Sequence, residues 1–248
     1  PWIHVAFENA AAVASGIVEA VEIMKEKGRS KHDHVDVIAI GGDGGTFDIG
    51  FGALSGALER GHDFVYMVYD NGAYQNTGIQ RSGGTFQGQE TTTSWAGEKI
   101  PGKLETKKPI AEIVAAHRIP YVATVSPAYH RDFVKKFRTA LEVDGPAFIY
   151  AISPCPRGWR SQTSTSIELS KLAVEVGLHP LYEVIDGVEW KMSGPSKRIK
   201  ELKPLEEYWK TQGQFKHLMK PKWKDFATQI QEHISSEWEL LKKRCDVE

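Results

Sequence analysis

The sequence has few cysteines and no long apolar run, and each shortage excludes a class of protein. Two cysteines in 248 residues, Cys155 and Cys245, are too few for a disulfide-stapled secreted fold or for a four-cysteine metal site built by this chain alone. Charge or glycine interrupts every apolar stretch before the roughly 18 residues that cross a bilayer, and no signal-like segment opens the chain. We therefore expect a cytoplasmic protein without membrane contact.

An excess of charge of one sign is also absent. The chain has 31 basic and 32 acidic residues, and no long basic run marks a nucleic-acid surface. A composition that is 41% hydrophobic and 25% charged is typical of a globular protein with a buried core. The length fits one large α/β domain with an appendage, or two small domains.

Apolar periodicity predicts alternating helices and buried strands. Residues 7–27 repeat apolar side chains at three- and four-residue intervals, as a half-buried helix does. Residues 35–40 are β-branched without alternation, which is typical of a strand covered on both faces. We predict a doubly wound, mostly parallel α/β sheet. The other predicted elements are helices at 48–60, 110–117 and 130–142, and strands at 64–69, 121–124 and 147–152.

The character of the sequence changes after Trp159. We predict an α/β domain at residues 1–159 and a C-terminal extension with a subunit-docking tail at 160–248. The extension should contain a helix near 167–176, a hairpin at 181–192 and an apolar helical face that needs a partner surface. That face comprises Trp223, Phe226, Ile230, Ile234, Trp238 and Leu241.

Polar residues follow two neighbouring predicted strands. Gly42-Asp43-Gly44 ends one strand and Asp70-Asn71 ends the next. Ligands of doubly wound sheets bind outside the carboxyl ends of the strands, so Asp43 and Asn71 should approach a common point. Carboxylate and amide oxygens suit Mg²⁺, and the N-terminus of the helix after Gly45 can receive a diphosphate. The pattern predicts a metal-bridged diphosphate site.

These glycines also have simpler interpretations. A lone Gly-Asp-Gly is most often a tight turn, but here it is paired with Asp70-Asn71. The Gly-x-Gly-x-x-Gly spacing of a dinucleotide site and the Gly-Lys-Ser/Thr of a P-loop are both absent. The long segment 80–108, rich in Gly, Ser and Thr, is predicted to be a functional loop at the same sheet edge.

The run from Gly42 to Ser82 resembles the cofactor-binding segment of the β subunits of pyruvate:ferredoxin and related 2-oxoacid:ferredoxin oxidoreductases. Three further blocks resemble the same family in the same order, and the likeness extends to about residue 220. The blocks are Ala-His-Arg-Ile-Pro-Tyr-Val-Ala-Thr at 116–124, Gly-Pro-Ala-Phe-Ile at 145–149 and Pro-Cys-Pro-Arg-Gly-Trp at 154–159.

The resemblance implies a thiamine-diphosphate-binding subunit of an enzyme that oxidatively decarboxylates a 2-oxoacid, with pyruvate as the default. The implied partners are the other subunits of the complex, the 2-oxoacid, CoA as acyl acceptor, and ferredoxin, which receives electrons through an iron–sulfur cluster. In this family the glutamate that activates the aminopyrimidine lies in another subunit.

The resemblance also implies roles for individual residues. The side chains of Asp43 and Asn71 and the main-chain carbonyl of Ala73 would ligate Mg²⁺, and Asn76 would reach the thiazolium and the substrate as a catalytic residue. A turn-capping role for Asn76 remains open. The implied neighbours of the diphosphate are Gly42, Gly44 and Gly45.

Cys155 is implied as the last of four thiolate ligands of a [4Fe-4S] cluster. The other three precede the region where this chain begins, so we expect an N-terminal stretch of the domain to be missing from it. On spacing alone Cys155 would be a half-buried small residue. Cys245 is expected to be an incidental thiol.

Alternatives remain for the substrate and for the reaction. Gly72 and Phe47 stand where many relatives have Glu and Ala, which leaves an aromatic or dicarboxylic 2-oxoacid such as phenylglyoxylate or oxalate as an alternative to pyruvate. A non-oxidative thiamine-diphosphate decarboxylase or synthase would lack the electron exit that the Cys155 loop suggests. A scaffold subunit without cofactor is disfavoured by the intact Asp43 and Asn71.

Overall fold

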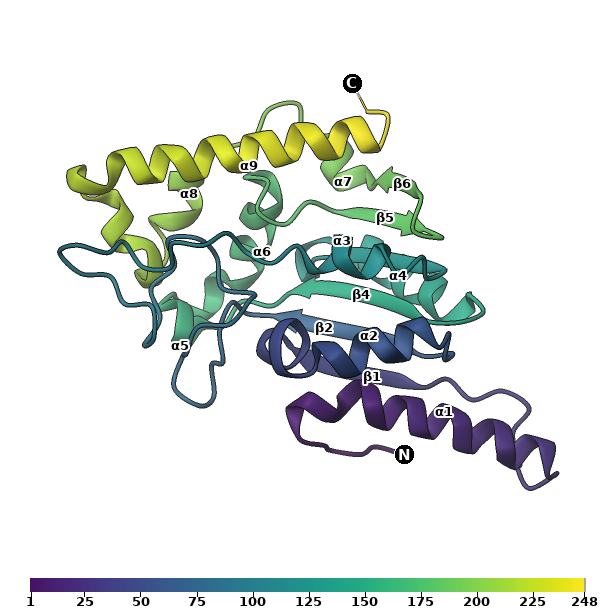
Figure 1. Ribbon diagram of the computed structural model, residues 1–248. Helices are drawn as coiled ribbons and strands as arrows, with labels where there is room; N and C mark the ends of the chain where they lie inside the picture. The colour runs from purple at the N-terminus through teal and green to yellow at the C-terminus, as the bar shows by residue number, and fades with distance from the viewer. Residues whose placement is uncertain (248) are drawn as a thin grey trace.

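A central sheet organises the chain in the computed structural model, which describes residues 1–247 (Figure 1). Its strand order is β1-β2-β4-β3-β5-β6. The first four strands run parallel, and β5 and β6 are added antiparallel. The predicted α/β fold class with a mostly parallel sheet is thus confirmed. The strands are β1 (Ile38–Gly42), β2 (Val65–Asp70), β3 (Tyr121–Val125), β4 (Ala147–Ile152), β5 (Tyr182–Ile185) and β6 (Glu189–Met192).

Helices cover both faces of the sheet and its carboxyl end. Most lie within a few residues of their predicted positions, because apolar periodicity marks them well. The α-helices are α1 (Ala10–Glu26), α2 (Phe51–Glu59), α3 (Ile110–Ala115), α4 (His130–Glu142), α5 (Pro156–Trp159), α6 (Ser166–Glu175), α7 (Gly194–Lys197), α8 (Leu205–Trp209) and α9 (Lys224–Arg244). A π-helical turn spans Gly44–Ile49, and 3₁₀ turns span Phe7–Asn9, Pro127–Tyr129, Thr163–Thr165, Gly213–Met219 and Pro221–Trp223.

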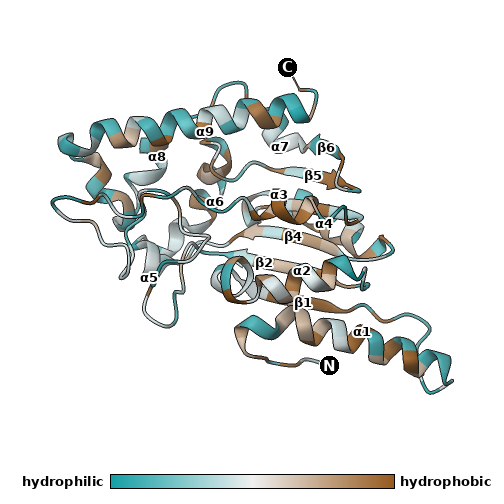
Figure 2. Cartoon of the chain, viewed as in Figure 1, coloured by the Kyte–Doolittle hydropathy of each residue, from teal (hydrophilic) through white to brown (hydrophobic). Residues whose placement is uncertain are grey.

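Two apolar clusters sandwich the sheet. On one face, α1, α2, α3 and the end of α9 pack on strand side chains such as Tyr66 and Phe148, whose rings stack at 5.9 Å. On the other face, α4 packs on Ala123 and Ile149. Figure 2 shows the hydrophobic residues concentrated in the strands and in α3. Burial of this kind contributes ~1.5–3 kcal/mol for each large apolar side chain.

Strand β1 is less covered than its sequence predicts. Ile38 and Ile40 are 44% and 58% exposed, and their side chains lie on the opposite face of the strand from buried Ala39. Helix α4 contacts β3 and β4 and leaves this side of β1 open. The prediction that residues 35–40 are covered on both faces is therefore wrong for one face. The cause is position, because β1 is the edge strand of the sheet in the described part of the chain.

The C-terminal helix finds its partner surface within the chain. On α9, Ile230, Trp238 and Leu241 are buried, and Phe226 and Ile234 are partly buried. The predicted partner surface for this face therefore lies within the chain, and docking of the segment 160–248 on another subunit stays a prediction.

The parts before and after residue 159 also share a core. A third apolar cluster joins Phe86, Ile152 and Trp159 to residues of α6, α8 and α9. None of the helices described between residues 1 and 247 is long and apolar enough to cross a bilayer.

Candidate functional site

Two of the polar residues singled out from the sequence meet at the carboxyl edge of the sheet. Strands β1 and β2 are parallel neighbours, with Gly42 opposite Tyr69. Asp43 therefore leaves β1 beside the turn in which Asn71 leaves β2. The arrangement follows from parallel pairing, which brings the ends of both strands to one edge.

The oxygen atoms of this turn have the spacing of a magnesium site. One end of the Asn71 side-chain amide lies 3.0 Å from Asp43 Oδ1 and 2.8 Å from the carbonyl oxygen of Ala73. Neighbouring ligands of octahedral Mg²⁺, each about 2.1 Å from the ion, stand about 3 Å apart. The amide can offer its oxygen to a cation, or donate from its nitrogen to both oxygens when no cation is bound. The donor set therefore fits Mg²⁺.

These donors are hard oxygen ligands. Within residues 1–247, no group of three or more His, Cys, Asp or Glu side chains is arranged to hold a metal ion. A site formed by one carboxylate, one amide oxygen and one main-chain carbonyl suits Mg²⁺ better than a softer transition metal.

The carboxylate of Asp43 is deeply buried. Its exposed fraction is 1%, and burial, followed by the charge of nearby Asp70, raises its pKa to about 7. The Ser82 hydroxyl donates to Oδ2, which leaves Oδ1 facing Asn71. A cation at this point would favour the ionised form of Asp43, because its positive charge offsets the loss of hydration that burial imposes on the carboxylate.

Asp70 is already satisfied by this chain. It accepts hydrogen bonds from the Tyr150 hydroxyl at 2.7 Å and from the Gly72 amide at 2.9 Å, and it forms an ion pair with Lys107. The Lys107 ammonium also lies 3.8 Å from the centre of the Phe86 ring. Asp70 thus supports the turn, and Asp43 is the carboxylate available to a metal. Sequence reasoning missed Lys107 and Tyr150, which come from distant segments.

The glycines after β1 are required by close packing. A Cβ on Gly44 would lie 2.1 Å from the Tyr74 ring, and one on Gly45 would lie 2.8 Å from the Phe7 carbonyl oxygen. A Cβ on Gly42 would have more room, because its nearest neighbour, the Tyr69 side chain, would be 3.6 Å away. Gly44 opens the π-helical turn, whose Gly50 amide bonds to the Gly45 carbonyl at 2.9 Å. A helical N-terminus thus begins directly at Asp43, as a diphosphate site needs.

Gly84 is a site residue that the sequence interpretation overlooked. A Cβ there would lie 2.8 Å from Asp43 Cβ and 3.0 Å from Asp70 Oδ1. We expect Gly84→Ala to push the two carboxylates aside and weaken Mg²⁺ binding by about tenfold or more, as changes that disturb ligand orientation do. Titration calorimetry with Mg²⁺ and thiamine diphosphate measures the change.

Gly52→Ala is the matched control, because a Cβ at that α2 position would meet nothing within 4 Å. We expect this variant to bind Mg²⁺ normally and to unfold at a slightly higher temperature, since alanine stabilises helix interiors. Equal Mg²⁺ affinity in the two variants would contradict the role of Gly84.

Asn76 is not brought to the Asp43–Asn71 point. It is exposed at the tip of a turn closed by pairing of Tyr74 with Gln80, and its side chain makes no hydrogen bond within the described residues. Its role towards the thiazolium and the substrate stays a prediction.

The Cys155 loop packs directly on the turn at residues 70–73. The Trp159 indole donates to the Asn71 carbonyl oxygen at 2.7 Å, and the Ser153 amide donates to the Asp70 carbonyl oxygen at 2.8 Å. Cys155 is a free, partly buried thiol that precedes α5. Cys245 belongs to a different apolar cluster, and burial raises its pKa to about 11. The structure thus brings Cys155, but not Cys245, near the site.

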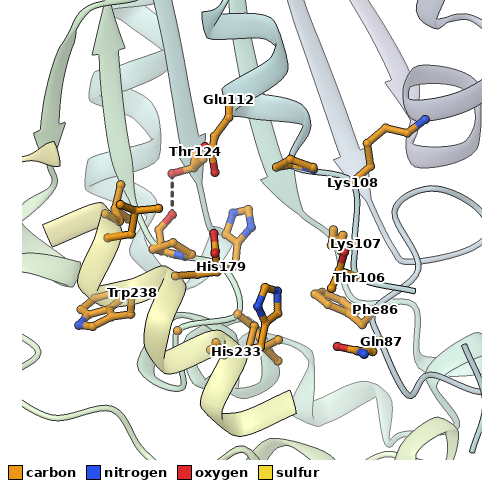
Figure 3. Close-up of a pocket in the computed structure, with 18 of the residues that line it drawn as sticks. Phe86, Gln87, Thr106, Lys107, Lys108, Glu112, Thr124, His179, His233 and Trp238 are labelled. Atoms are coloured by element: carbon orange, nitrogen blue, oxygen red, sulfur yellow. Dashed lines mark hydrogen bonds between the residues drawn. The ribbon is translucent and has the colours of Figure 1, made fainter. Parts of the chain in front are cut away.

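A cavity of about 180 Å³ lies between α9 and the sheet (Figure 3). Lys107, Phe86, Trp238 and His179 are among its lining residues. Burial lowers the pKa of His179 to about 4, and its Nε2 contacts the Val125 carbonyl at 2.9 Å. The imidazole is therefore neutral, with Nε2 as the donor.

Comparison with known proteins identifies the family. The family described as "Thiamine pyrophosphate enzyme, C-terminal TPP binding domain" matches residues 1–151. Pyruvate synthase subunit PorB of Methanocaldococcus jannaschii is 50% identical over 97% of this chain and 78% of that protein. Ketoisovalerate oxidoreductase subunit VorB of Pyrococcus furiosus is 47% identical over 98% of this chain and 76% of that protein.

Among solved structures, a 2-oxoglutarate:ferredoxin oxidoreductase from Magnetococcus marinus aligns with 66% of this chain and 58% of its own, at 22% identity and a TM-score of 0.49, a likeness too partial to carry an argument. The family match and the two curated relatives agree with each other and with the oxygen site at the sheet edge. This chain belongs to the thiamine-pyrophosphate-binding subunits of the 2-oxoacid:ferredoxin oxidoreductases.

Proposed function

We propose that the chain binds Mg²⁺ and thiamine diphosphate in a pyruvate synthase, in which pyruvate is oxidatively decarboxylated, CoA accepts the acetyl group and ferredoxin accepts the electrons. One observation carries the proposal. The oxygens of Asp43, Asn71 and Ala73 converge in a chain that is 50% identical to a pyruvate synthase subunit across nearly its whole length.

Asp43, Asn71 and the Ala73 carbonyl would hold the metal, and the metal would hold the diphosphate at the start of the helical turn at Gly44. The bound cofactor supplies the electron sink for decarboxylation. The residues of this chain bind and orient it. The Asp70–Lys107 ion pair and the Tyr150 hydroxyl fix the turn from behind, and Ser82 holds the second oxygen of Asp43.

Cys155 is proposed as a thiolate ligand of an iron–sulfur cluster close to the cofactor. Such a cluster requires four ligands, and Cys245, the other cysteine of the sequence, packs in a different apolar cluster. The other thiolates must therefore come from outside the printed sequence. The position supports the proposal, because the Cys155 loop is bonded to the turn that carries Asn71.

The substrate assignment is tested on the assembled complex with pyruvate and with 2-ketoisovalerate, following CoA-dependent reduction of ferredoxin. We expect kcat/KM to be at least about tenfold higher for pyruvate, a difference that a substrate pocket built for a small side chain can supply. The isolated chain, given metal, cofactor and acceptor, should not turn over, because the family places the activating glutamate in another subunit.

Preference for 2-ketoisovalerate would replace pyruvate with a branched-chain substrate, in line with the VorB relative. Release of an aldehyde without ferredoxin reduction would favour the non-oxidative decarboxylase instead. Turnover by the isolated chain at the rate of the complex would overturn the division of the site between subunits.

A further inference from the structure

The main-chain carbonyl of Asn71 is held by two side chains of this chain. It accepts two hydrogen bonds, one from the Trp159 indole at 2.7 Å and one from the Gln75 side chain at 2.8 Å. Trp159 is fully buried. A carbonyl held by two donors cannot rotate without losing both bonds, so these bonds fix the peptide plane of Asn71.

Trp159 is itself held firmly. Its amide donates to the Cys155 carbonyl at 2.8 Å, and its ring meets the Tyr208 ring edge-on at 6.2 Å. The contact between the two segments is tight as well, because a Cβ on Gly158 would lie 1.8 Å from Gln75 Oε1. Helix α5 therefore packs directly against the turn at residues 71–75.

We propose that Trp159 is a positioning residue for the metal site: its indole N–H fixes the backbone of Asn71, so that the metal-binding turn and the Cys155 loop form one rigid unit. The inference rests on the proposed role of Asn71 as a Mg²⁺ ligand. Mg²⁺ demands near-ideal octahedral geometry, so the Asn71 side chain would bind it less tightly if the Asn71 backbone were free to change its orientation. Residues that orient ligands in this way commonly alter metal affinity by about 10- to 100-fold.

The test is Trp159→Phe, which keeps an aromatic ring and removes the N–H, measured in the assembled complex. The Mg²⁺ concentration for half-maximal thiamine diphosphate binding should rise about tenfold. At saturating Mg²⁺ and cofactor, kcat should return to near the wild-type value, because the chemistry does not pass through the indole. A general loss of folding would not be rescued by Mg²⁺.

Trp209→Phe is the matched control. Trp209 is buried in the same apolar cluster as Trp159 and, within the described residues, makes no hydrogen bond to the turn at 71–75. Its replacement should leave the Mg²⁺ half-saturation unchanged. Gln75→Leu removes the second donor to the same carbonyl and should raise the half-saturation in the same direction, which keeps the inference testable if Trp159→Phe does not fold.

Two results would overturn the inference. One is a Mg²⁺ half-saturation in both Trp159→Phe and Gln75→Leu equal to that of Trp209→Phe; the other is a loss in both that excess Mg²⁺ fails to restore. If Asp43→Ala abolishes Mg²⁺ dependence while these variants behave normally, only the positioning role fails. If the wild-type complex binds the cofactor without Mg²⁺, the proposed metal site fails with it.

Discussion

Replacement of Asp43 with alanine is expected to abolish Mg²⁺-dependent binding of thiamine diphosphate. The affinity should fall by more than about 100-fold, because loss of a metal ligand costs more than loss of a residue that only orients a ligand. Asp43 Oδ1 is the only charged oxygen among the three that converge, and its partner Asp70 is committed to Lys107 and Tyr150. Calorimetry and retention of cofactor on gel filtration measure the loss.

The fold should survive this substitution. Because burial raises the pKa of Asp43 to about 7, ionisation of this carboxyl costs stability as the pH rises from about 4 to 7, so its removal should not unfold the chain. Asp33→Ala, at an exposed position before β1, is the control and should bind normally. Full retention of cofactor by Asp43→Ala would remove the metal assignment.

Replacement of Cys155 with serine should lower the iron content of the assembled complex or alter the EPR spectrum of its cluster, and reduce electron transfer to ferredoxin by about 100-fold or more. The reason is that a hydroxyl is a much poorer iron ligand than a thiolate. Thiamine diphosphate binding should persist, because serine preserves the backbone that links this loop to Asn71.

Cys245→Ser is the control and should leave iron content, spectrum and rate unchanged, because that thiol packs in a different apolar cluster. If both variants retain wild-type iron and wild-type spectra, Cys155 is a packed thiol and the cluster lies elsewhere. The Asp43 and Cys155 variants thus separate cofactor binding from electron exit.

The fold was predictable where periodicity is strong. Helix α4 and strand β4 begin and end where the sequence places them, because their apolar patterns are uninterrupted. The prediction that β1 is covered on both faces is wrong because hydrophobicity shows only that a residue can be buried. Whether a strand face is buried depends on which helix packs on it. The helix predicted at 48–60 is preceded by a π-helical turn at Gly44–Ile49, which the sequence does not mark because a π-helical turn has no sequence period of its own.

The candidate site was predictable only where it depends on the order of strands along the chain. The approach of Asp43 to Asn71 follows from the order of strands and glycines alone. Gly84, Lys107, Tyr150 and Trp159 were missed because their roles depend on contacts across many residues; Tyr150 and Asp70, for example, are 80 positions apart. A signal existed for Gly84 and Lys107, which lie in the loop at 80–108 predicted to stand at the same sheet edge, and for Trp159, which ends the block at 154–159.

Helix α9 crosses between two of the apolar clusters. Its Ile230 packs in the cluster that contains Trp159, and its Trp238 and Leu241 pack in the cluster on the sheet. A helix that packs in two clusters makes their unfolding cooperative, because neither cluster can unfold without losing its contacts with the shared helix. Heat or denaturant should therefore unfold the turn at residues 70–75 and the C-terminal region in a single transition, and a protease cut within α9 should loosen the sheet edge at Asp43 and Asn71 from a distance.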